Sequence, residues 1–309
     1  MTDLARPSAP KLSAVLIVHN EAHCLEQCLR SISPIVDEII VIDSGSTDGT
    51  IAIARSFGAH VEVSDWPGFG PQKNHALSRA RGEWVLAIDA DEHLTPQLAD
   101  SIREALSSRK PTANGFFIQF LATWCGKPVC FGDWAGKRHL RLFRRGFARF
   151  SDDPVHERII GQPPYATLNG LMIHDTVATE AEAAEKCQRY ADLSAPALAA
   201  KGRGGLPSSL SHSAWTLMRG FLLKGGFLDG VVGWKVALVC AKGTFLRYRI
   251  AGKMRTSSRG SSSSVKEMGF MAVSGLSASS LWVERLSVQG GALLLDCGSA
   301  DLSVSLCYA

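Results

Sequence analysis

The sequence predicts an α/β fold, with a mostly parallel sheet flanked by helices and a helical extension toward the C-terminus. Three observations lead to this fold class. Short apolar runs alternate with segments of helical periodicity over the first third of the chain. The composition, 46% hydrophobic and 20% charged over 309 residues, is typical of globular proteins and excludes disorder throughout. The 29 glycines follow no collagen period, and no repeat of about 20–50 residues is present.

The first third of the chain predicts four strands, each followed by a helix. Each strand is a short apolar run suited to a buried position in a parallel sheet. We expect the strands at 13–18, 39–42, 61–63 and 84–88. We expect the helices from a cap at Asn20 to 32, at 47–57 with Gly58 as the stop, at 71–80, and from Thr95 and Pro96 to about 107. Such sheets bind ligands at the carboxyl ends of their strands.

Beyond residue 114 the alternation stops. Strands are expected at 115–121, 139–143 and 165–173, and a helix at 179–201, where Thr179 and Glu182 form a capping box. Two helices of mixed apolar and basic character follow at 207–224 and 227–249. We therefore divide the chain into a leader at 1–11, expected to be disordered, an α/β domain at 12–175, a basic helical extension at 176–256, and a serine-rich tail at 257–309 of uncertain structure.

The net charge of +4 conceals an uneven distribution. Between Lys201 and Arg259 there are eleven Lys or Arg residues and one acidic residue, Asp229, which leaves a charge of +10 there and −6 elsewhere. The residues between 215 and 249 hold no uncharged run near the ~20 residues that a spanning helix needs. Basic residues interleaved with Trp, Phe and Leu favour helices that lie on an anionic membrane surface, and the alternative is a pair of helices packed on the α/β domain.

The leader and the cysteines indicate a cytoplasmic protein. Residues 1–11 contain no apolar run, so a cleaved signal peptide is not expected. The eight cysteines form no CxxC pair, which favours reduced thiols and gives no reason to expect a zinc site.

The segment DADE, at 89–92, directly follows the fourth predicted strand. Asp89 and Asp91 lie two residues apart in an extended segment, so their carboxylates project the same way and repel each other unless a cation lies nearby. Oxygen ligands that leave open positions suit Mg²⁺ or Mn²⁺ shared with a diphosphate. The alternative for this short motif alone is a solvated acidic loop before a helix.

Three further polar clusters accompany it: VHNEA at 18–22, DSGSTDGT at 43–50 and GFGPQKNHAL at 68–77. The first two directly follow predicted strands, and the third precedes a helix. Asp43 can accept a hydrogen bond from a base or sugar, and Lys73 can approach a phosphate, although neither a Walker loop nor GxGxxG is present. Taken singly, each cluster could equally be a turn that caps a helix.

Together and in this order, the four clusters resemble the nucleotide-sugar domain of family 2 glycosyltransferases of the GT-A fold. The similarity is greatest to bacterial lipopolysaccharide inner-core β-1,4-glucosyltransferases that use UDP-glucose, and it covers roughly residues 12–250. The resemblance implies a catalytic domain at 12–175, with a nucleotide half at 12–112 and an acceptor half at 113–175. It also implies that Mg²⁺ or Mn²⁺ is the cofactor. From the basic, apolar helices described above, we expect peripheral contact with the anionic inner membrane on its cytoplasmic face.

The resemblance also implies roles for individual residues. Asp43 would contact the nucleobase, Asp89 would lie near the ribose and the metal, and Asp91 would bind the metal that bridges the diphosphate. Asn20, Glu21 and Lys73 match positions that line the nucleotide pocket. Ser44 stands where the family's commoner DDGS form has a second acid.

The acceptor side is expected in two segments, WAGKRHLRLFRR at 134–145 and FSDDPVHERI at 150–159. An inverting transfer needs a base for the acceptor hydroxyl, and Glu157 is our first choice with Asp153 second. Ion pairing with nearby arginines is the alternative for both. His156 could equally be catalytic, structural or next to a metal, and His174, after a predicted strand, is expected to be structural. Four arginines, Arg138, Arg141, Arg144 and Arg145, could bind phosphate or form a solubilising face on an edge strand. Trp124 and Trp134 could stack on a sugar or belong to the core.

The reaction expected from this resemblance is transfer of a hexose, glucose first, from a UDP-sugar to a heptose of the lipopolysaccharide inner core. The alternatives are transfer to another lipid, glycan or protein, a nucleotidyltransferase, and a basic nucleic-acid-binding protein. The nucleotidyltransferase is disfavoured because VHNEA stands where a glycine-rich loop is usual. Nucleic-acid binding is disfavoured because carboxylates at strand ends repel phosphates.

Overall fold

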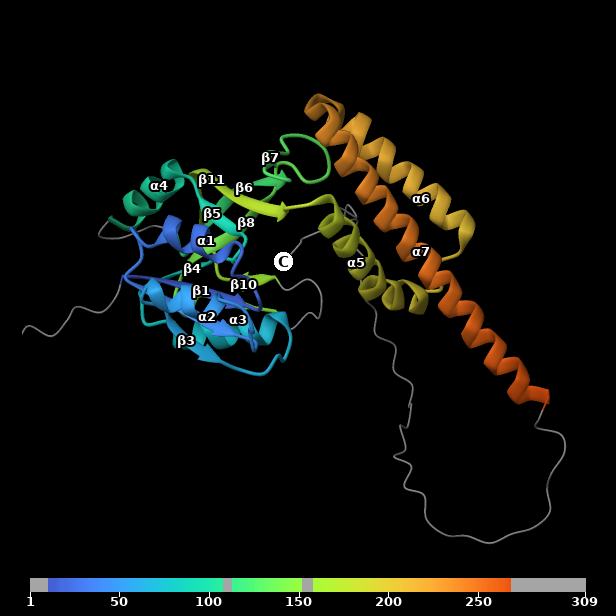
Figure 1. The fold of residues 1–309 in the computed structure, drawn as a ribbon, viewed down its shortest axis with the longest axis horizontal. Helices are drawn as coiled ribbons and strands as arrows, with labels where there is room; N and C mark the ends of the chain where they lie inside the picture. Colours follow the sequence, from blue (N-terminus) through green and yellow to red (C-terminus); the bar gives the residue numbers. More distant parts are fainter. Residues whose placement is uncertain (1–10, 108–112, 152–157, 268–309) are drawn as a thin grey trace, which may run out of the picture.

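A computed structural model describes residues 11–107, 113–151 and 158–267, with side chains described up to residue 256 (Figure 1). In the first half, strands and helices alternate as expected. The elements are β1 (Leu12–Val18), α1 (Leu25–Ile32), β2 (Glu38–Asp43), α2 (Thr50–Ser56), β3 (His60–Val63), α3 (Phe69–Arg79), β4 (Trp84–Ala87), β5 (Glu92–Leu94) and α4 (Pro96–Ser107).

The second half adds strands first and helices last. Its strands are β6 (Gly115–Trp124), β7 (Lys127–Pro128), β8 (Arg138–Arg144), β9 (Ala148–Phe150), β10 (Ile159–Gly161) and β11 (Tyr165–Val177). Its helices are α5 (Glu180–Ala200), α6 (Leu206–Met218), a π-helical turn η1 (Arg219–Leu223), a 3₁₀ turn η2 (Gly226–Asp229) and α7 (Gly230–Glu267).

One mixed sheet joins the two halves of the α/β domain. Its strand order is β3-β2-β1-β4-β8-β6-β11-β5, with β7 paired to β6. The strands β3, β2, β1 and β4 are parallel, as predicted for the first half. In the second half β8 runs antiparallel to both β4 and β6, so the whole sheet is mixed. The chain leaves β1 toward β2 on one side and reaches β4 on the other, and such a switch point opens a crevice at the carboxyl ends of the strands.

Helices cover both faces of the sheet, which confirms the predicted layering. On one face, Leu25, Leu29 and Ile32 of α1 and Leu98 and Ile102 of α4 pack on the sheet. On the other face, α3 packs through its small Ala76, with Ala80 at its end. Strands β1, β2 and β4 contribute side chains to both clusters, so they are buried on both faces and read as continuous apolar runs.

The structure differs from two local predictions. Helix α1 begins at Leu25, and Asn20 is not its cap. Asn20 has φ = 58°, and its Oδ1 accepts a hydrogen bond from the Thr47 backbone N–H at 2.8 Å, so this side chain ties the loop after β1 to the loop after β2. A helix was expected at 227–249, but α7 runs from Gly230 to Glu267 and enters the serine-rich tail, because extending an established helix costs less than nucleating one.

The alternatives for the tryptophans and arginines are also decided. Trp124 and Trp134 are buried, and their ring centroids lie 5.7 Å apart, so both belong to the core. Strand β8 lies between β4 and β6 and is not an edge strand, which makes the edge-strand interpretation wrong. Arg144 and Arg145 contact Trp84 and the Gly82 carbonyl near the start of β4, at the end opposite to the crevice.

The helical extension forms a separate layer beside the α/β domain (Figure 1). Helix α5 begins at the predicted capping box, where the Thr179 side chain accepts a hydrogen bond from the Glu182 N–H. Helix α7 contacts both α5 and α6. Among the residues that the structure describes, no helix has the length and apolar character needed to cross a membrane.

Candidate active site

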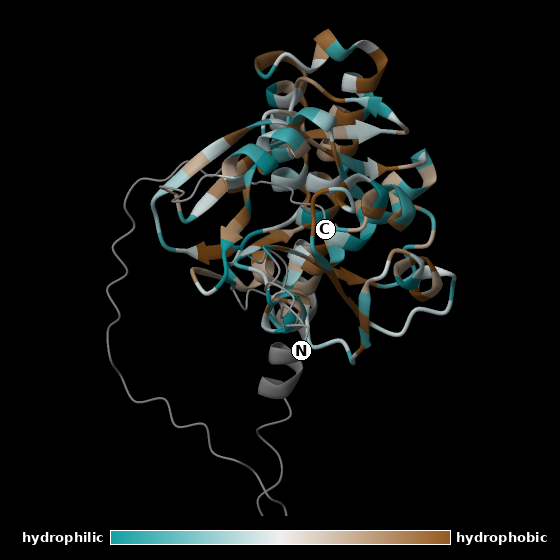
Figure 2. Cartoon of the chain, turned by 90° about the vertical axis from the view of Figure 1, so that its left-hand side faces the viewer, coloured by the Kyte–Doolittle hydropathy of each residue, from teal (hydrophilic) through white to brown (hydrophobic). Residues whose placement is uncertain are grey.

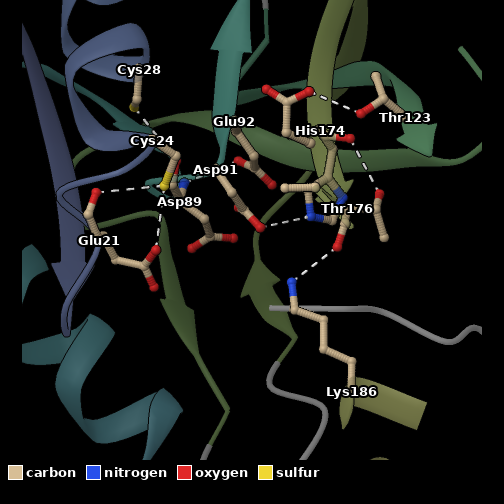
Figure 3. A network of polar contacts seen from close by, with 12 residues as sticks. Glu21, Cys24, Cys28, Asp89, Asp91, Glu92, Thr123, His174, Thr176 and Lys186 are labelled. Atoms are coloured by element: carbon tan, nitrogen blue, oxygen red, sulfur yellow. Dashed lines mark hydrogen bonds and ion pairs between the residues drawn. The ribbon is translucent and has the colours of Figure 1, made fainter. Parts of the chain in front are cut away.

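The polar clusters that follow β1, β2 and β4 meet at the carboxyl edge of the sheet, as the topology requires. Figure 3 shows the centre of this site, where Glu21 from the β1 side faces Asp89 and Asp91 after β4, and His174 of β11 approaches from the acceptor half. The loop after β1 is held to the turn after β2 by backbone donors, since Glu21 N donates to Thr50 Oγ1 at 2.8 Å. The site therefore draws on both halves of the sheet.

Asp89 is held by two cations. Its Oδ1 lies 2.9 Å from Lys73 Nζ and its Oδ2 lies 2.8 Å from an Arg141 guanidinium nitrogen. The Arg141 guanidinium also lies 2.5 Å from Glu92 Oε1, and the second Glu92 oxygen accepts a hydrogen bond from the Asp89 N–H at 3.0 Å. Lys73 comes from α3 and Arg141 from β8, so this network joins three elements that are far apart in the sequence.

The pKa values of the two carboxyls move in opposite directions. Burial alone would raise the pKa of Asp89, but the charges of Lys73 and Arg141 outweigh it and hold that pKa far below its ordinary value. Burial raises the pKa of Glu92, and the neighbouring Asp89 charge adds to the rise in spite of Arg141. Asp89 is therefore the ionised partner of Lys73 and Arg141.

Asp91 forms a second pair, with His174. Asp91 Oδ2 lies 3.2 Å from His174 Nε2, and both side chains are less than one-fifth exposed (Figure 3). Burial opposes the charge on each group, but their mutual attraction prevails, so the pKa of Asp91 is lowered and the pKa of His174 is raised. Lys186 of α5 lies on the same side, where its Nζ donates to the Thr176 carbonyl at 2.9 Å.

Asp43 closes the site on the β2 side. Asp43 is fully buried, and its Oδ1 accepts hydrogen bonds from the Gly45 and Ser46 N–H groups at 2.8 Å each. Its Oδ2 is buried with no hydrogen-bond partner among the residues that the structure describes. Beside this turn lies an open cleft of about 500 Å³, lined by Ser44, Gly45, Glu62, Val63, Ser64, Asp65 and Trp66.

Glu21 lies at the other side of the crevice and contacts a thiol. Cys24 Sγ lies 3.3 Å from Glu21 Oε2, and burial raises the pKa of the Glu21 carboxyl. Ligand atoms of Glu21, His23 and Cys24 lie within 4.8 Å of one another. Burial and the Glu21 charge raise the pKa of the Cys24 thiol, so this thiol is protonated beside the Glu21 carboxyl.

The donor side of the site therefore brings together Glu21, Asp43, Lys73, Asp89 and Asp91, with Asn20 bracing the loop between them. The predicted bases Asp153 and Glu157, and His156 with them, lie outside the described residues. The chain on either side of them is anchored, because Ser151 N donates to the Arg158 carbonyl at 2.8 Å. Asn74 fixes Phe150 through two hydrogen bonds, next to Lys73.

Sequence reasoning missed three participants. His174 was expected to be structural, Glu92 had no role, and Arg141 was one of four equivalent arginines. The available signals were that His174 lies near the end of a strand and that Arg141 alternates with buried positions in β8. Neither signal indicates which strand lies next to β4 or β5.

The donor atoms at Asp91 and His174 fit a divalent cation. A carboxylate oxygen and an imidazole nitrogen are both common ligands of Mn²⁺, and a carboxylate also suits Mg²⁺. Both oxygens of Asp89 contact cationic side chains, so Asp89 would have to exchange one of these ion pairs to bind a metal.

Comparison with known proteins places these residues in a family. The family model for glycosyl transferase family 2 matches residues 13–116, which contain all four polar clusters. A glycosyltransferase of Rickettsia conorii, uncharacterized, is 30% identical over 261 residues, which are 80% of this chain and 91% of that protein. LpsC of Rhizobium meliloti, a lipopolysaccharide core biosynthesis glycosyltransferase, is 31% identical over 196 residues, which are 61% of this chain and 72% of LpsC.

Among solved structures, similarity is found to glucosyl-3-phosphoglycerate synthase from Mycobacterium tuberculosis in complex with Mn²⁺, UDP-glucose and phosphoglyceric acid. The sequence identity is 29%, the TM-score is 0.31, and the match covers 37% of this chain and 44% of that chain.

Proposed function

This chain belongs to the family 2 glycosyltransferases, and we propose that it transfers a hexose, glucose in the first instance, from a UDP-sugar to a heptose of the lipopolysaccharide inner core. Family membership makes it an enzyme and sets aside the nucleotidyltransferase and nucleic-acid-binding alternatives. The observation that carries the donor part of the proposal is the convergence of Asp43, Lys73 and the Asp91–His174 pair at the crevice between β1 and β4.

The buried Asp43 fits a nucleobase contact. Its Oδ1 is fixed by two backbone donors, while its Oδ2 has no partner among the described residues and is ready to accept a hydrogen bond. Uracil carries one ring N–H donor, so a uracil in the adjacent cleft would satisfy an oxygen that is otherwise costly to bury. Trp66 lines this cleft and is about half exposed, and it offers an aromatic face to the same ligand.

The diphosphate is expected between Lys73 and Asp91. When bound there, Mg²⁺ or Mn²⁺ held by Asp91 and His174 would neutralise the charge that develops on the leaving diphosphate. Lys73 lies beside Asp89 with its side chain largely buried and contributes a positive charge at the same edge. Arg141 keeps Asp89 ionised and fixed, so the loop that carries Asp91 is held in place from both sides.

The acceptor part of the proposal rests on the similarity to LpsC and on the sequence segment that carries the predicted bases. In an inverting transfer, Glu157 or Asp153 takes the proton of the acceptor hydroxyl while its oxygen bonds to the anomeric carbon of the hexose. The bond from that carbon to the β-phosphate oxygen breaks on the opposite face, and UDP leaves with the electron pair. The product is a β-glycoside. The segment that carries these two residues joins the described chain beside Asn74 and Lys73.

The proposal is tested by UDP release from UDP-glucose, UDP-galactose and UDP-N-acetylglucosamine, with heptose-terminated inner-core lipopolysaccharide and with Mg²⁺, Mn²⁺ or EDTA. We expect release with UDP-glucose that needs both the acceptor and the metal, and that Asp91→Asn abolishes. The matched control is Asp100→Asn, because Asp100 is an exposed carboxylate of α4. Release that persists in EDTA contradicts the metal assignment. UDP release only with another acceptor contradicts the inner-core acceptor and still supports transferase activity.

A further inference from the structure

Helix α6 exposes apolar side chains and buries small polar ones, which is the reverse of a helix on a water-soluble domain. Its residues Leu206, Leu210 and Met218 are between 41% and 55% exposed, and Leu222 continues the same four-residue spacing into η1 at 56%. On the side that packs against the protein, Ser209 is completely buried and Thr216 is 9% exposed. No Lys, Arg, Asp or Glu occurs between Gly204 and Met218.

The contact between α6 and α7 combines one stacked ring pair, His212 on Tyr248 with centroids 4.4 Å apart, with small residues at its other close points. The Thr216 hydroxyl lies 3.3 Å from the Thr244 hydroxyl of α7. A Cβ atom on Gly252 would lie 2.5 Å from the Gly205 nitrogen, so two backbones meet there without side chains between them. Close helix pairs with Gly, Ser and Thr inside and large apolar side chains outside are the arrangement found where lipid surrounds the helices.

The turn between the two helices is also apolar and exposed. Leu223, Phe227, Leu228 and Val231 are between 49% and 70% exposed. The loop between β7 and β8 is held beside this turn, because Asp229 accepts hydrogen bonds from the Cys130 and Phe131 N–H groups. Phe131 of this loop is 40% exposed. Figure 2 shows this turn at the top of the molecule, largely in the brown of hydrophobic residues. We call the exposed residues of α6, η1, η2 and the start of α7 the apolar face.

Basic residues accompany the apolar face. Lys242 and Lys253 are exposed on α7, beyond the apolar start of that helix. The stretch from Lys201 to Arg259 carries eleven basic residues against Asp229, and the Asp229 carboxylate is occupied by the β7–β8 loop. Trp215 and Trp234 are 48% and 42% exposed on the same two helices, and indole rings are enriched at the boundary between water and lipid.

We propose that the apolar face is a membrane-docking surface that lies on an anionic bilayer. The hairpin of α6 and α7 would place its leucines in the acyl boundary and its lysines among the phosphate headgroups. Arg219, Lys224 and Lys235 of this stretch pair with Asp133 and Glu180, so the charge of +10 falls to +8 when these two acidic residues are counted. This positive charge favours an anionic bilayer over a second copy of the chain, because two such surfaces would repel each other. The inference does not depend on the sugar donor or on transferase activity.

The test is sedimentation of the full chain with vesicles, without any sugar substrate. Vesicles of phosphatidylcholine alone are compared with vesicles of phosphatidylcholine and phosphatidylglycerol in equal parts. We expect binding to the anionic vesicles, weaker binding to the neutral ones and weaker binding at high salt. Leu210→Glu and Leu222→Glu are each expected to weaken vesicle binding about tenfold, since a half-exposed leucine no longer inserts and a negative charge is added.

The matched control is Ile160→Glu, because Ile160 is 48% exposed on β10 and lies outside the hairpin. This variant is expected to bind vesicles as the wild type does, and the melting temperature of each variant checks that it is folded. Absence of vesicle binding by the wild-type chain, or equal binding by all three variants, would overturn the proposal. A dimer that Leu210→Glu dissociates, with no vesicle binding, would show that the apolar face joins two copies of the chain instead.

Discussion

Replacing Arg141 by methionine should destabilise the protein strongly, because this side chain joins the acceptor half of the sheet to the nucleotide half. One guanidinium nitrogen contacts Asp89 at 2.8 Å and Glu92 at 2.5 Å. Glu92 is 1% exposed and Asp89 is 14% exposed at the side chain, so neither carboxylate can be rehydrated without a change in structure. Methionine is an unbranched side chain that can still lie over the Phe120 ring, and it removes the guanidinium with its charge, its hydrogen bonds and its cation–π contact.

The expected cost follows from the partners that remain. Removing one member of a buried ion pair costs about 3–5 kcal/mol. Asp89 keeps Lys73 at 2.9 Å, and Glu92, whose pKa is already raised, can take up a proton. We therefore expect the lower end, about 3 kcal/mol, which for a protein of this size lowers the melting temperature by roughly 6–12 °C.

A double-mutant cycle separates the charge effect from a packing effect. In the Arg141→Met background, Glu92→Gln should restore about half of the lost stability, because an amide needs no counter-charge. Urea unfolding of the two single variants and the double variant measures this coupling. Arg138→Met, at an exposed position of the same strand, is the control and should unfold with the wild type. The reasoning is refuted if Arg141→Met unfolds with the wild type, or if Glu92→Gln has the same effect in both backgrounds.

Three further substitutions test the proposed sugar-donor site, the start of strand β2 and the pair of helices α6 and α7. Asp43→Asn places an amide donor beside the expected uracil N–H and should weaken UDP binding by at least about tenfold in calorimetry, while Asp100→Asn should not. Burial alone would raise the pKa of Glu38, but hydrogen bonds from Ser13 and Arg81 lower it. The ionised Glu38 therefore stabilises the folded state at any pH above its unfolded-state pKa, and this stabilisation is lost as the pH falls through its folded-state pKa. Glu38→Gln should therefore cost about 2 kcal/mol at neutral pH in urea unfolding and progressively less in acid, whereas the exposed Glu26→Gln should cost little at any pH. Gly252→Ala should cost about 1–3 kcal/mol, because its Cβ would meet the Gly205 backbone, whereas Gly243→Ala in the same helix meets nothing closer than Cys187 Sγ at 3.4 Å and should be neutral or stabilising.

The sequence predicted that the polar clusters of the first half meet at the carboxyl ends of the strands, because the relevant information there is local. A buried strand followed by a polar cluster fixes both the strand and the edge of the sheet at which the cluster lies. Asp43 and Asp89 each come at or just after the end of such a run, and the parallel pairing of β1 with β2 and β4 brings them together. No long-range contact had to be known beyond the alternation of strands and helices.

The acceptor half could not be predicted in the same way. Its strands β8, β6 and β11 are neighbours in an order that does not follow the chain, and β5 of the nucleotide half lies beside β11 at the end of the sheet. His174 meets Asp91 only because β11 pairs with β5 in a register that sets His174 opposite Glu92. Periodicity reports which face of a strand is buried, and it carries no information about which strand lies next to it.

The buried face of helix α6 could not be predicted from its sequence pattern either. A helix with leucines on one face and serines on the other predicts burial of the leucines, since a soluble domain is the usual surrounding. Helix α6 does the opposite, because Gly204, Gly205 and Gly252 let the start of α6 approach the backbone of α7 closely, and the small Ser209 and Thr216 are buried on that side. The basic charge of the stretch indicated a surface partner, and the choice of face required the structure.

The charges at the site explain why Asp91, more than Asp89, suits a cation. Asp89 has two permanent cations, Lys73 and Arg141, and both of its oxygens contact them. Asp91 is paired with His174, which is positively charged only while it holds a second ring proton, and a histidine can lose that proton. A divalent cation between Asp91 and His174 would take the place of that proton and use the same two atoms as ligands. At Asp89 the same cation would have to displace an arginine or a lysine and leave a buried positive charge without its partner. The cations around Asp89 therefore hold the loop in place, and the exchangeable proton between Asp91 and His174 supports our proposal that the metal binds there.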